Sequence, residues 1–211
     1  MRELQAARGA AITAHAASGN DASDSAATGS ASPRGALPPG VARALAVGIG
    51  LVGWGIDQGT KALALAYLDP ENPPVLLGGL LTLQLIHNPG AAFSLGENFT
   101  VVLTAIAASA LVFVSWRLIP RVRHRGWAVG LGLLLAGILG NLTDRLIRPP
   151  GVARGHVVDF LQLPNFAIFN VADMCITFAA VTLGWLVLIR QVDLAGRSTR
   201  EAPKPDAGEA G

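Results

Sequence analysis

The chain has 211 residues, of which 51% are hydrophobic and only 14% are charged, and its mean hydropathy is +0.47. A soluble domain has about 25% charged residues, so this composition indicates a membrane protein. The near balance of 16 basic and 14 acidic residues argues against nucleic-acid binding, and the single cysteine, Cys175, excludes both an internal disulfide and a multi-cysteine metal site.

Both ends of the chain are polar, and the apolar residues lie between them. Residues 1–40 are rich in Ala, Ser and Gly and contain no long apolar run, so we expect a disordered leader and no secretory signal peptide. Residues 191–211 are also polar, and there we expect a disordered tail. Residues 41–190 are therefore expected to form one transmembrane domain.

Within that domain, four apolar stretches each predict a membrane-spanning helix. They cover residues 44–56, 98–116, 126–143 and 174–189, and the first of them continues past Asp57 and Lys61 to Tyr67. A spanning helix needs roughly 20 mostly apolar residues. Only the second stretch meets this length alone, and the others must include Asp57, Asp144 or Asp173 near one end. Buried helices of a soluble protein are the alternative, but four such stretches favour an all-α membrane protein with four transmembrane helices.

The basic residues predict the orientation of these helices. The link between the second and third helices holds four arginines and no acid, Arg43 precedes the first helix, and Arg190 follows the last. Because positively charged links stay in the cytoplasm, both termini are expected inside and residues 68–97 and 146–168 outside.

The first outward link also carries a strand signal. Leu81, Leu83 and Leu85 alternate with polar residues, which predicts a short strand, and the sequence Asn88-Pro89-Gly90 predicts a turn. We therefore expect a small β-rich element on the outer surface.

Four carboxylates gather at the outward ends of the predicted helices or just beside them. An ionisable group inside a membrane is costly and is a functional candidate by default. These carboxylates belong to Asp57, Asp144, Asp159 and Asp173, and they are accompanied by Asn88, Asn141 and Asn170.

Each of these residues also has a simpler structural explanation. Asp57 and Lys61 have the i, i+4 spacing of an ion pair on one helix. Asp144 and Arg145 could form a charge pair at a helix end, and Asn170 with Asp173 could cap the fourth helix. The occurrence of all of them at one depth favours a functional site.

Helical spacing and local polarity suggest what this site does. Asn141, Asp144 and Arg145 share one helix face, as do Asn170 and Asp173. Asp159 lies in an apolar string, Val157-Val158-Asp159-Phe160, where lost solvation raises the pKa of a carboxyl group. Two neighbouring carboxyl groups can share one proton and act as acid and base, as in aspartic proteases. A short link separates Asp159 from Asp173, so the two can form such a pair.

Five segments, in order, resemble the motifs of lipoprotein signal peptidase (signal peptidase II), a family of bacterial membrane aspartic peptidases. The resemblance covers about residues 44–190. The segments are Asp57-Gln58-Gly59-Thr60-Lys61, Asn88-Pro89-Gly90-Ala91-Ala92-Phe93, Gly140-Asn141-Leu142-Thr143-Asp144-Arg145, His156-Val157-Val158-Asp159-Phe160 and Phe169-Asn170-Val171-Ala172-Asp173.

The resemblance implies a role for each candidate residue. Asp159 and Asp173 would be the catalytic pair that activates a water molecule. The residues that position the substrate and support the pair would be Asn88, Asn141, Arg145 and Asn170. Asp57 and Lys61 would hold the outer ends of the helices together, and Asp144 would order the site by hydrogen bonding.

The resemblance also implies a substrate and a location. The substrate would be a prolipoprotein whose cysteine already carries a diacylglyceryl group, and the cut would fall just before that cysteine. We expect a monomer in the bacterial plasma membrane, in contact with lipid, with its active site toward the outer face and with no cofactor or metal.

Two rival functions deserve comparison. A serine peptidase that uses Ser94 and Lys61 is conceivable, but it leaves the paired aspartates unexplained. A small proton- or cation-coupled transporter also carries carboxylates in the membrane, but it does not explain the order of the five motifs. His87 and His156 lack the spacing of a zinc protease.

Overall fold

The computed structural model describes residues 35–90 and 97–199. Its long helices are α2 (Pro39–Tyr67), α3 (Glu97–Phe113), α4 (Arg125–Ile147) and α5 (Val171–Gly184). The helix α3 continues through the turns η3 (Val114–Leu118) and η4 (Ile119–Arg121), and α5 continues through η5 (Trp185–Ile189). In this described part of the chain, four helical segments are long and apolar enough to cross a membrane, which confirms the four predicted spans.

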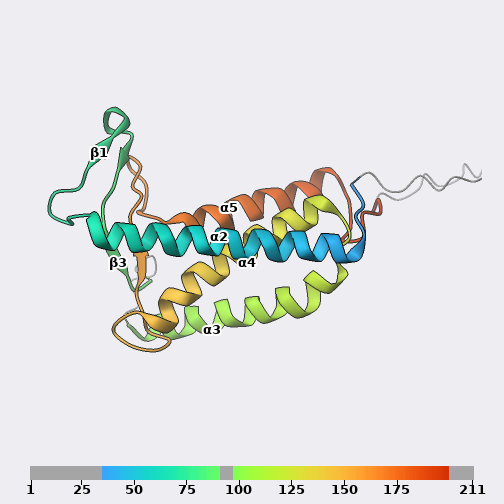
Figure 1. Cartoon of the computed structure of the whole chain (residues 1–211), viewed down its shortest axis with the longest axis horizontal. Coiled ribbons are helices and arrows are strands. Elements are labelled where there is room, and N and C mark those ends of the chain that lie inside the picture. The colour runs from blue at the N-terminus through green and yellow to red at the C-terminus, as the bar shows by residue number, and fades with distance from the viewer. Residues whose placement is uncertain (1–34, 91–96, 200–211) are drawn as a thin grey trace, which may run out of the picture. The chain divides into compact units, whose positions relative to one another are not determined.

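The third span, α4, is the centre of the bundle. It packs against α2, α3 and α5 (Figure 1). Of its most apolar stretch, 56% is buried inside the protein, against 17% for each of the other three spans. The outer faces of those three helices present apolar side chains such as Val52, Phe113 and Phe178, which are more than half exposed. Such surfaces suit a hydrocarbon surrounding.

Two small antiparallel sheets lie at one end of the bundle. The strand β1 (Val75–Leu76) pairs with β2 (Leu81–Thr82), and the turn η1 (Leu77–Gly79) joins them. The strand β3 (Ile86–Asn88) pairs with β4 (Val157–Asp159). The predicted β-rich element is therefore present, but the single strand expected at Leu81–Leu85 is wrong. The chain leaves the first sheet after Thr82 and joins a different partner from Ile86 onward.

The other end of the bundle is closed by short backbone contacts. The N–H group of Leu37 donates to the carbonyl of Arg123 at 2.7 Å, and that of Arg123 donates to the carbonyl of Leu194 at 2.9 Å. The first described residues, the α3–α4 link and the chain after η5 therefore meet at this end, as Figure 1 shows.

Two domain boundaries differ from the expected ones. The helix α2 begins at Pro39, inside the expected leader, because proline suits the first turn of a helix. Residues 191–199 form a turn instead of a disordered segment, since the Asp193 side chain accepts hydrogen bonds from the N–H groups of Ala195 and Arg197. The expectations for residues 1–34 and 200–211 lie outside the described residues.

Candidate active site

The pairing of β3 with β4 brings Asn88 next to Asp159. The antiparallel register sets Ile86 opposite Asp159 and Asn88 opposite Val157. The Asn88 side chain donates to Asp159 Oδ2 at 2.8 Å, while its Oδ1 accepts from the N–H group of Gly90 at 2.9 Å. Gly90 has φ +106°, a conformation that favours glycine, so the predicted turn orients Asn88 toward the aspartate.

The start of α5 supplies the second aspartate. Asn170 is the N-cap residue, and its Oδ1 accepts from the N–H group of Asp173 at 3.1 Å. The Asp173 carboxylate in turn accepts from the N–H group of Asn170 at 3.1 Å, which completes a capping box. The same Asn170 side chain donates to Asp159 Oδ1 at 2.5 Å. One asparagine thus links the two aspartates.

The outward part of α4 forms the side of the site next to Asp173. Asn141 donates to Asp173 Oδ1 at 2.8 Å and accepts from the Lys61 ammonium at 3.2 Å. Arg145 lies close enough to interact electrostatically with both Asp159 and Asp173. Its Nη1 donates to the carbonyl of Asn141, whereas its buried Nε has no hydrogen-bond partner among the described residues.

Behind the two aspartates lies a fully buried ion cluster. Lys61 Nζ is 2.9 Å from the Asp57 carboxylate and 2.7 Å from the Asp144 carboxylate, and all three side chains are at most 1% exposed. Arg148 adds a second cation at 2.6 Å from Asp144. Asp144 Oδ2 also accepts from the N–H group of Val158, in the strand that carries Asp159, at 3.2 Å. The cluster therefore connects α2 and α4 to the strand beneath the site.

Asp57 also reaches the fourth span. Its Oδ1 accepts from the N–H group of Ala172, in the first turn of α5, at 2.8 Å. This approach depends on Gly140, because a Cβ atom there would lie 2.5 Å from Asp57 Oδ2 and 2.7 Å from Ala172 Cβ. A carboxylate of the first span therefore satisfies a backbone N–H group at the start of the last span.

The two aspartates have different surroundings. Asp159 is 2% exposed, and this burial raises its pKa to about 6, with a further rise from the negative charge of Asp173. The hydrogen bonds from Asn88 and Asn170 act in the opposite direction because they stabilise the charged form. Asp173 is less buried than Asp159. Two neighbouring carboxyl groups in such different surroundings can share one proton.

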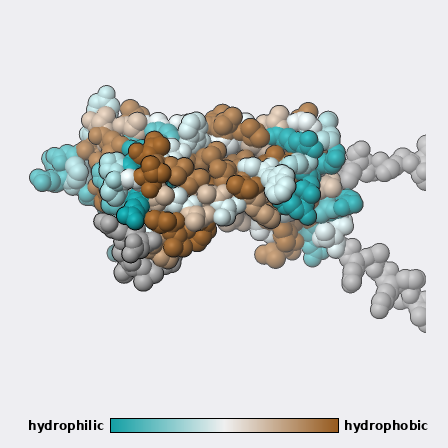
Figure 2. Space-filling model, turned by 90° about the horizontal axis from the view of Figure 1, so that it is seen from below, coloured by the Kyte–Doolittle hydropathy of each residue, from teal (hydrophilic) through white to brown (hydrophobic). Residues whose placement is uncertain are grey.

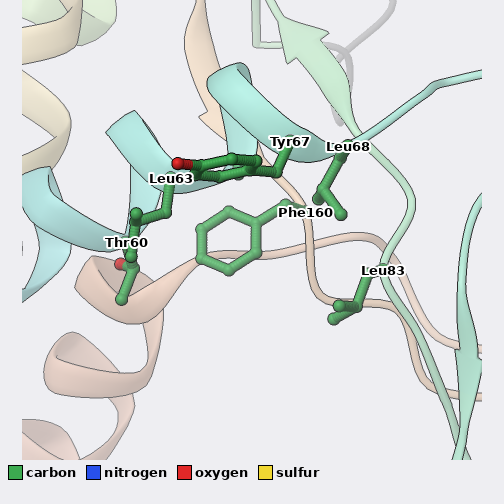
Figure 3. Close-up of a pocket in the computed structure, with 7 residues that line it drawn as sticks. Thr60, Leu63, Tyr67, Leu68, Leu83 and Phe160 are labelled. Carbon is green, nitrogen blue, oxygen red and sulfur yellow. The ribbon is translucent and has the colours of Figure 1, made fainter.

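An apolar groove of about 340 Å³ begins beside the site. Phe160, which follows Asp159, lies in the middle of this groove, with Tyr67 on one side and Leu83 on another (Figure 3). Thr60, Leu63, Ala64 and Leu68 complete the lining. Apart from the hydroxyl groups of Thr60 and Tyr67, its side chains are hydrocarbon, so the groove suits an apolar group. Within residues 35–90 and 97–199, no cluster of His, Cys, Asp or Glu has an arrangement that could hold a metal ion.

All nine residues predicted for the site come together, although one detail differs from expectation. Asp144 pairs with Lys61 and Arg148 and not with Arg145. The simpler structural explanations of the other two pairs are correct, and they are compatible with a functional site. Asp57 and Lys61 form an ion pair, and Asn170 caps α5. Ser94 of the rival serine mechanism, and Ala91, Ala92 and Phe93 of the second motif, lie outside the described residues.

Two residues of the cluster have no role in the sequence analysis. Arg148 stands four residues after Asp144, a spacing that could have revealed it. Gln58 Nε2 donates to Asp57 Oδ2 and to the carbonyl of Gly140, both at 3.1 Å. The only feature of the sequence that could have indicated a role for Gln58 is its position beside Asp57 in the first motif.

The chain is similar to known proteins in sequence and in fold. The family model for signal peptidase (SPase) II matches residues 49–189, which is more than half of the chain. A lipoprotein signal peptidase of Leifsonia xyli subsp. xyli is 47% identical over 147 residues, covering 69% of this chain and 67% of the relative. One from Mycobacterium avium is 41% identical over 156 residues, covering 74% and 84%.

The fold is also found in a solved structure of a bacterial membrane enzyme, with a TM-score of 0.55 and 25% sequence identity. That similarity covers 73% of this chain and 96% of the other. Five ordered motifs, four spans and the assembled pair of aspartates lead to the same conclusion as these comparisons: the chain belongs to the signal peptidase II family.

Proposed function

We propose that this protein is an aspartic endopeptidase of the membrane that removes signal peptides from lipoprotein precursors, with Asp159 and Asp173 as its catalytic residues. The observation that carries the proposal is the Asn170 side chain, which contacts both aspartates and joins them into one hydrogen-bonded unit. The family and the names of its relatives support the substrate class. They give no support to a transporter.

The reaction requires one protonated and one charged carboxyl group. The charged carboxylate accepts a proton from a water molecule as that water attacks the scissile carbonyl carbon, and the protonated group donates a proton to the leaving nitrogen. The buried Nε–H group of Arg145, which has no partner among the described residues, is a donor for a substrate carbonyl. Asn88, Asn141 and Asn170 hold the carboxylates in place through the hydrogen bonds described above.

The supporting cluster has a separate role in this proposal. Lys61, Asp57 and Asp144 connect the first and third spans and hold Asn141 and the strand β4 in position. The cut falls before a cysteine that carries a diacylglyceryl group, and such a lipid keeps the scissile bond close to the membrane. We further propose that the protein acts as a monomer, that both termini are cytoplasmic and that the site faces outward. The excess of arginines at the end opposite the aspartates supports this orientation.

The decisive experiment replaces each aspartate separately. Asp159→Asn and Asp173→Asn should each lower the rate of cleavage of a lipidated prolipoprotein by at least about 10³-fold, because each removes a proton-transfer group. Asp69→Asn is the matched control, since Asp69 is an exposed aspartate in the outer link. Near-normal cleavage by either dyad variant would refute the assignment. Loss of cleavage in Ser94→Ala would favour the serine mechanism instead.

A further inference from the structure

A second pocket lies at the opposite end of the bundle from the aspartates. It has a volume of about 410 Å³ and lies where α4 begins and η5 ends, two segments that run side by side in Figure 1. Its lining includes His124, Arg125, Gly126, Trp185, Leu186 and Arg190. The proposed peptidase reaction uses none of these residues.

The charge of this pocket is positive and has no counter-ion among the described residues. Arg125 and Arg190 are exposed and form no ion pair with any residue in 35–90 or 97–199. The nearby acid, Asp193, is already engaged, because it pairs with Arg197 at 2.8 Å and accepts two backbone N–H groups of its own turn. Two arginines of one pocket are therefore available to an anion.

The start of α4 adds to this positive potential. The first turn of a helix carries a partial positive charge and usually has an acidic residue or a side-chain cap beside it. In α4 the first turn contains no acidic residue and the N-cap residue provides no side-chain cap, while Arg125 occupies the first helical position. An anion at this point would offset both the helix dipole and the arginine charge.

The pocket also lies at a level where lipid headgroups are expected. It is formed by the ends of two membrane spans, α4 and α5 with η5. Trp185 lines it and is 56% exposed, and tryptophan is the residue enriched at the boundary between lipid and water. Figure 2 shows hydrophilic residues at this end of the bundle beside the apolar surface of the spans. The buried Leu186 gives the pocket an apolar wall as well.

We propose that this pocket binds the headgroup of an anionic phospholipid. The lipid phosphate lies between the guanidinium groups of Arg125 and Arg190, whose planar forks match phosphate oxygens. Trp185 and Leu186 contact the glycerol and the upper part of the acyl chains. Basic pockets between spanning helices bind anionic headgroups in other membrane proteins. This proposal is independent of peptidase activity, because binding is measured without substrate.

The test measures lipid binding to the intact chain in a neutral detergent by native mass spectrometry. Phosphatidylglycerol should bind more tightly than zwitterionic phosphatidylcholine. In the double variant Arg125→Gln/Arg190→Gln, affinity for phosphatidylglycerol should fall about 30-fold, because each juxtamembrane arginine contributes about 1 kcal/mol. The matched control is Arg117→Gln/Arg123→Gln, which removes the same charge from exposed arginines of the same end that do not line the pocket. That control should lower the affinity by less than about 3-fold.

Several outcomes would overturn the proposal. Equal losses in the two double variants would mean diffuse attraction to a basic surface and no defined site. Equal binding of the two lipids by the unchanged chain would remove the requirement for an anion. If inorganic phosphate bound the pocket with an arginine-dependent affinity while phosphatidylglycerol did not, the pocket would be a site for free phosphate.

Two further measurements separate binding from folding. The melting temperature of Arg125→Gln/Arg190→Gln in detergent should equal that of the unchanged chain, since neither arginine has an ion-pair partner to lose. Arg125→Lys/Arg190→Lys keeps both charges and loses the forks, so its affinity should lie between those of the unchanged chain and the Gln variant. Binding by the Lys variant as weak as that of the Gln variant, with normal melting, would contradict the electrostatic part of the proposal.

Discussion

Asn170 serves two purposes with one side chain. Its oxygen accepts from the N–H group of Asp173 and caps α5, while its amide nitrogen donates to Asp159. An amide can do both because it contains an acceptor and a donor. The helix cap and the proposed catalytic site therefore depend on the same residue, and stability and activity can be separated by the choice of replacement.

Serine and alanine at position 170 should differ in stability but not in activity. Asn170→Ser keeps a capping oxygen, whereas Asn170→Ala removes it at a cost of about 1 kcal/mol in the free energy of unfolding. Both lose the donor to Asp159, so both should cleave a prolipoprotein at least about 10²-fold more slowly. Thermal unfolding in detergent and initial cleavage rates test this. Full activity in Asn170→Ser would show that the contact with Asp159 is dispensable.

The pKa of Asp159 predicts how activity depends on pH. Burial raises this pKa to about 6, so the carboxyl group loses its proton as the pH rises through that value. Asp159 can then no longer donate a proton. We therefore expect kcat/KM to fall as the pH rises through about 6, because this parameter reports the free enzyme.

The variant Asn88→Ala provides a test with a defined direction. The hydrogen bond from Asn88 stabilises charged Asp159 and lowers its pKa. Removal of this bond should therefore raise the pH at which kcat/KM falls. His87→Ala is the control, because it changes the neighbouring residue, whose side chain has no role in the site. It should leave the pH at which kcat/KM falls unchanged. A shift to lower pH in Asn88→Ala would contradict this view of the pair.

At the scale of elements, the outward half of α4 shows what helical geometry adds to a motif. The sequence could place Asn141, Asp144 and Arg145 on one face. It could not choose the partner of Asp144, because Lys61 belongs to another helix and is brought close only by packing. Asp144 and Arg145 lie at opposite edges of that face, because neighbouring helix positions point about 100° apart. The residue four positions later, Arg148, is the one that reaches Asp144.

The outer strands show a second limit of sequence analysis. Alternation at Leu81–Leu85 predicted one strand, whereas the chain changes partners between β2 and β3. Alternation reports which side chains face one way and contains no information about the partner strand. The partner of β3 lies about 70 residues further along the chain, in β4. Its pairing is what brings Asn88 to Asp159.

Close contact of three spans at Gly140 leads to a prediction about packing. Gly140→Ala would set a methyl group against Asp57 and Ala172, so α4 must move away from its neighbours. We expect a loss of about 1–3 kcal/mol in the free energy of unfolding, together with reduced cleavage. Gly55→Ala is the control, because a Cβ atom there meets nothing within 4 Å. That change should be neutral or slightly stabilising. Equal melting temperatures for the two variants would contradict the packing described here.

At the scale of the whole molecule, the single cysteine allows a direct test of orientation. Cys175 is buried, so Cys175→Ser provides a background without thiols. Single cysteines are then introduced at two exposed positions, Asn72 in the outer link and Thr199 after η5. In intact cells stripped of any outer barrier, a membrane-impermeant thiol reagent should label Asn72→Cys, and it should label Thr199→Cys only after lysis. The reverse pattern would invert the proposed orientation.

The buried charges also have a consequence for the way the protein is made. Asp57 and Lys61 form an i, i+4 pair within α2, and Asp144 forms one with Arg148, the residue that follows α4. Each of these buried aspartates therefore has a counter-ion close by in the sequence before the other spans are in place. When α4 arrives, Lys61 gains Asp144 as a second partner without leaving Asp57. The N–H group of Ala172 finds Asp57 only after the last span is inserted. The proposed active site is therefore complete only once the last span is in place.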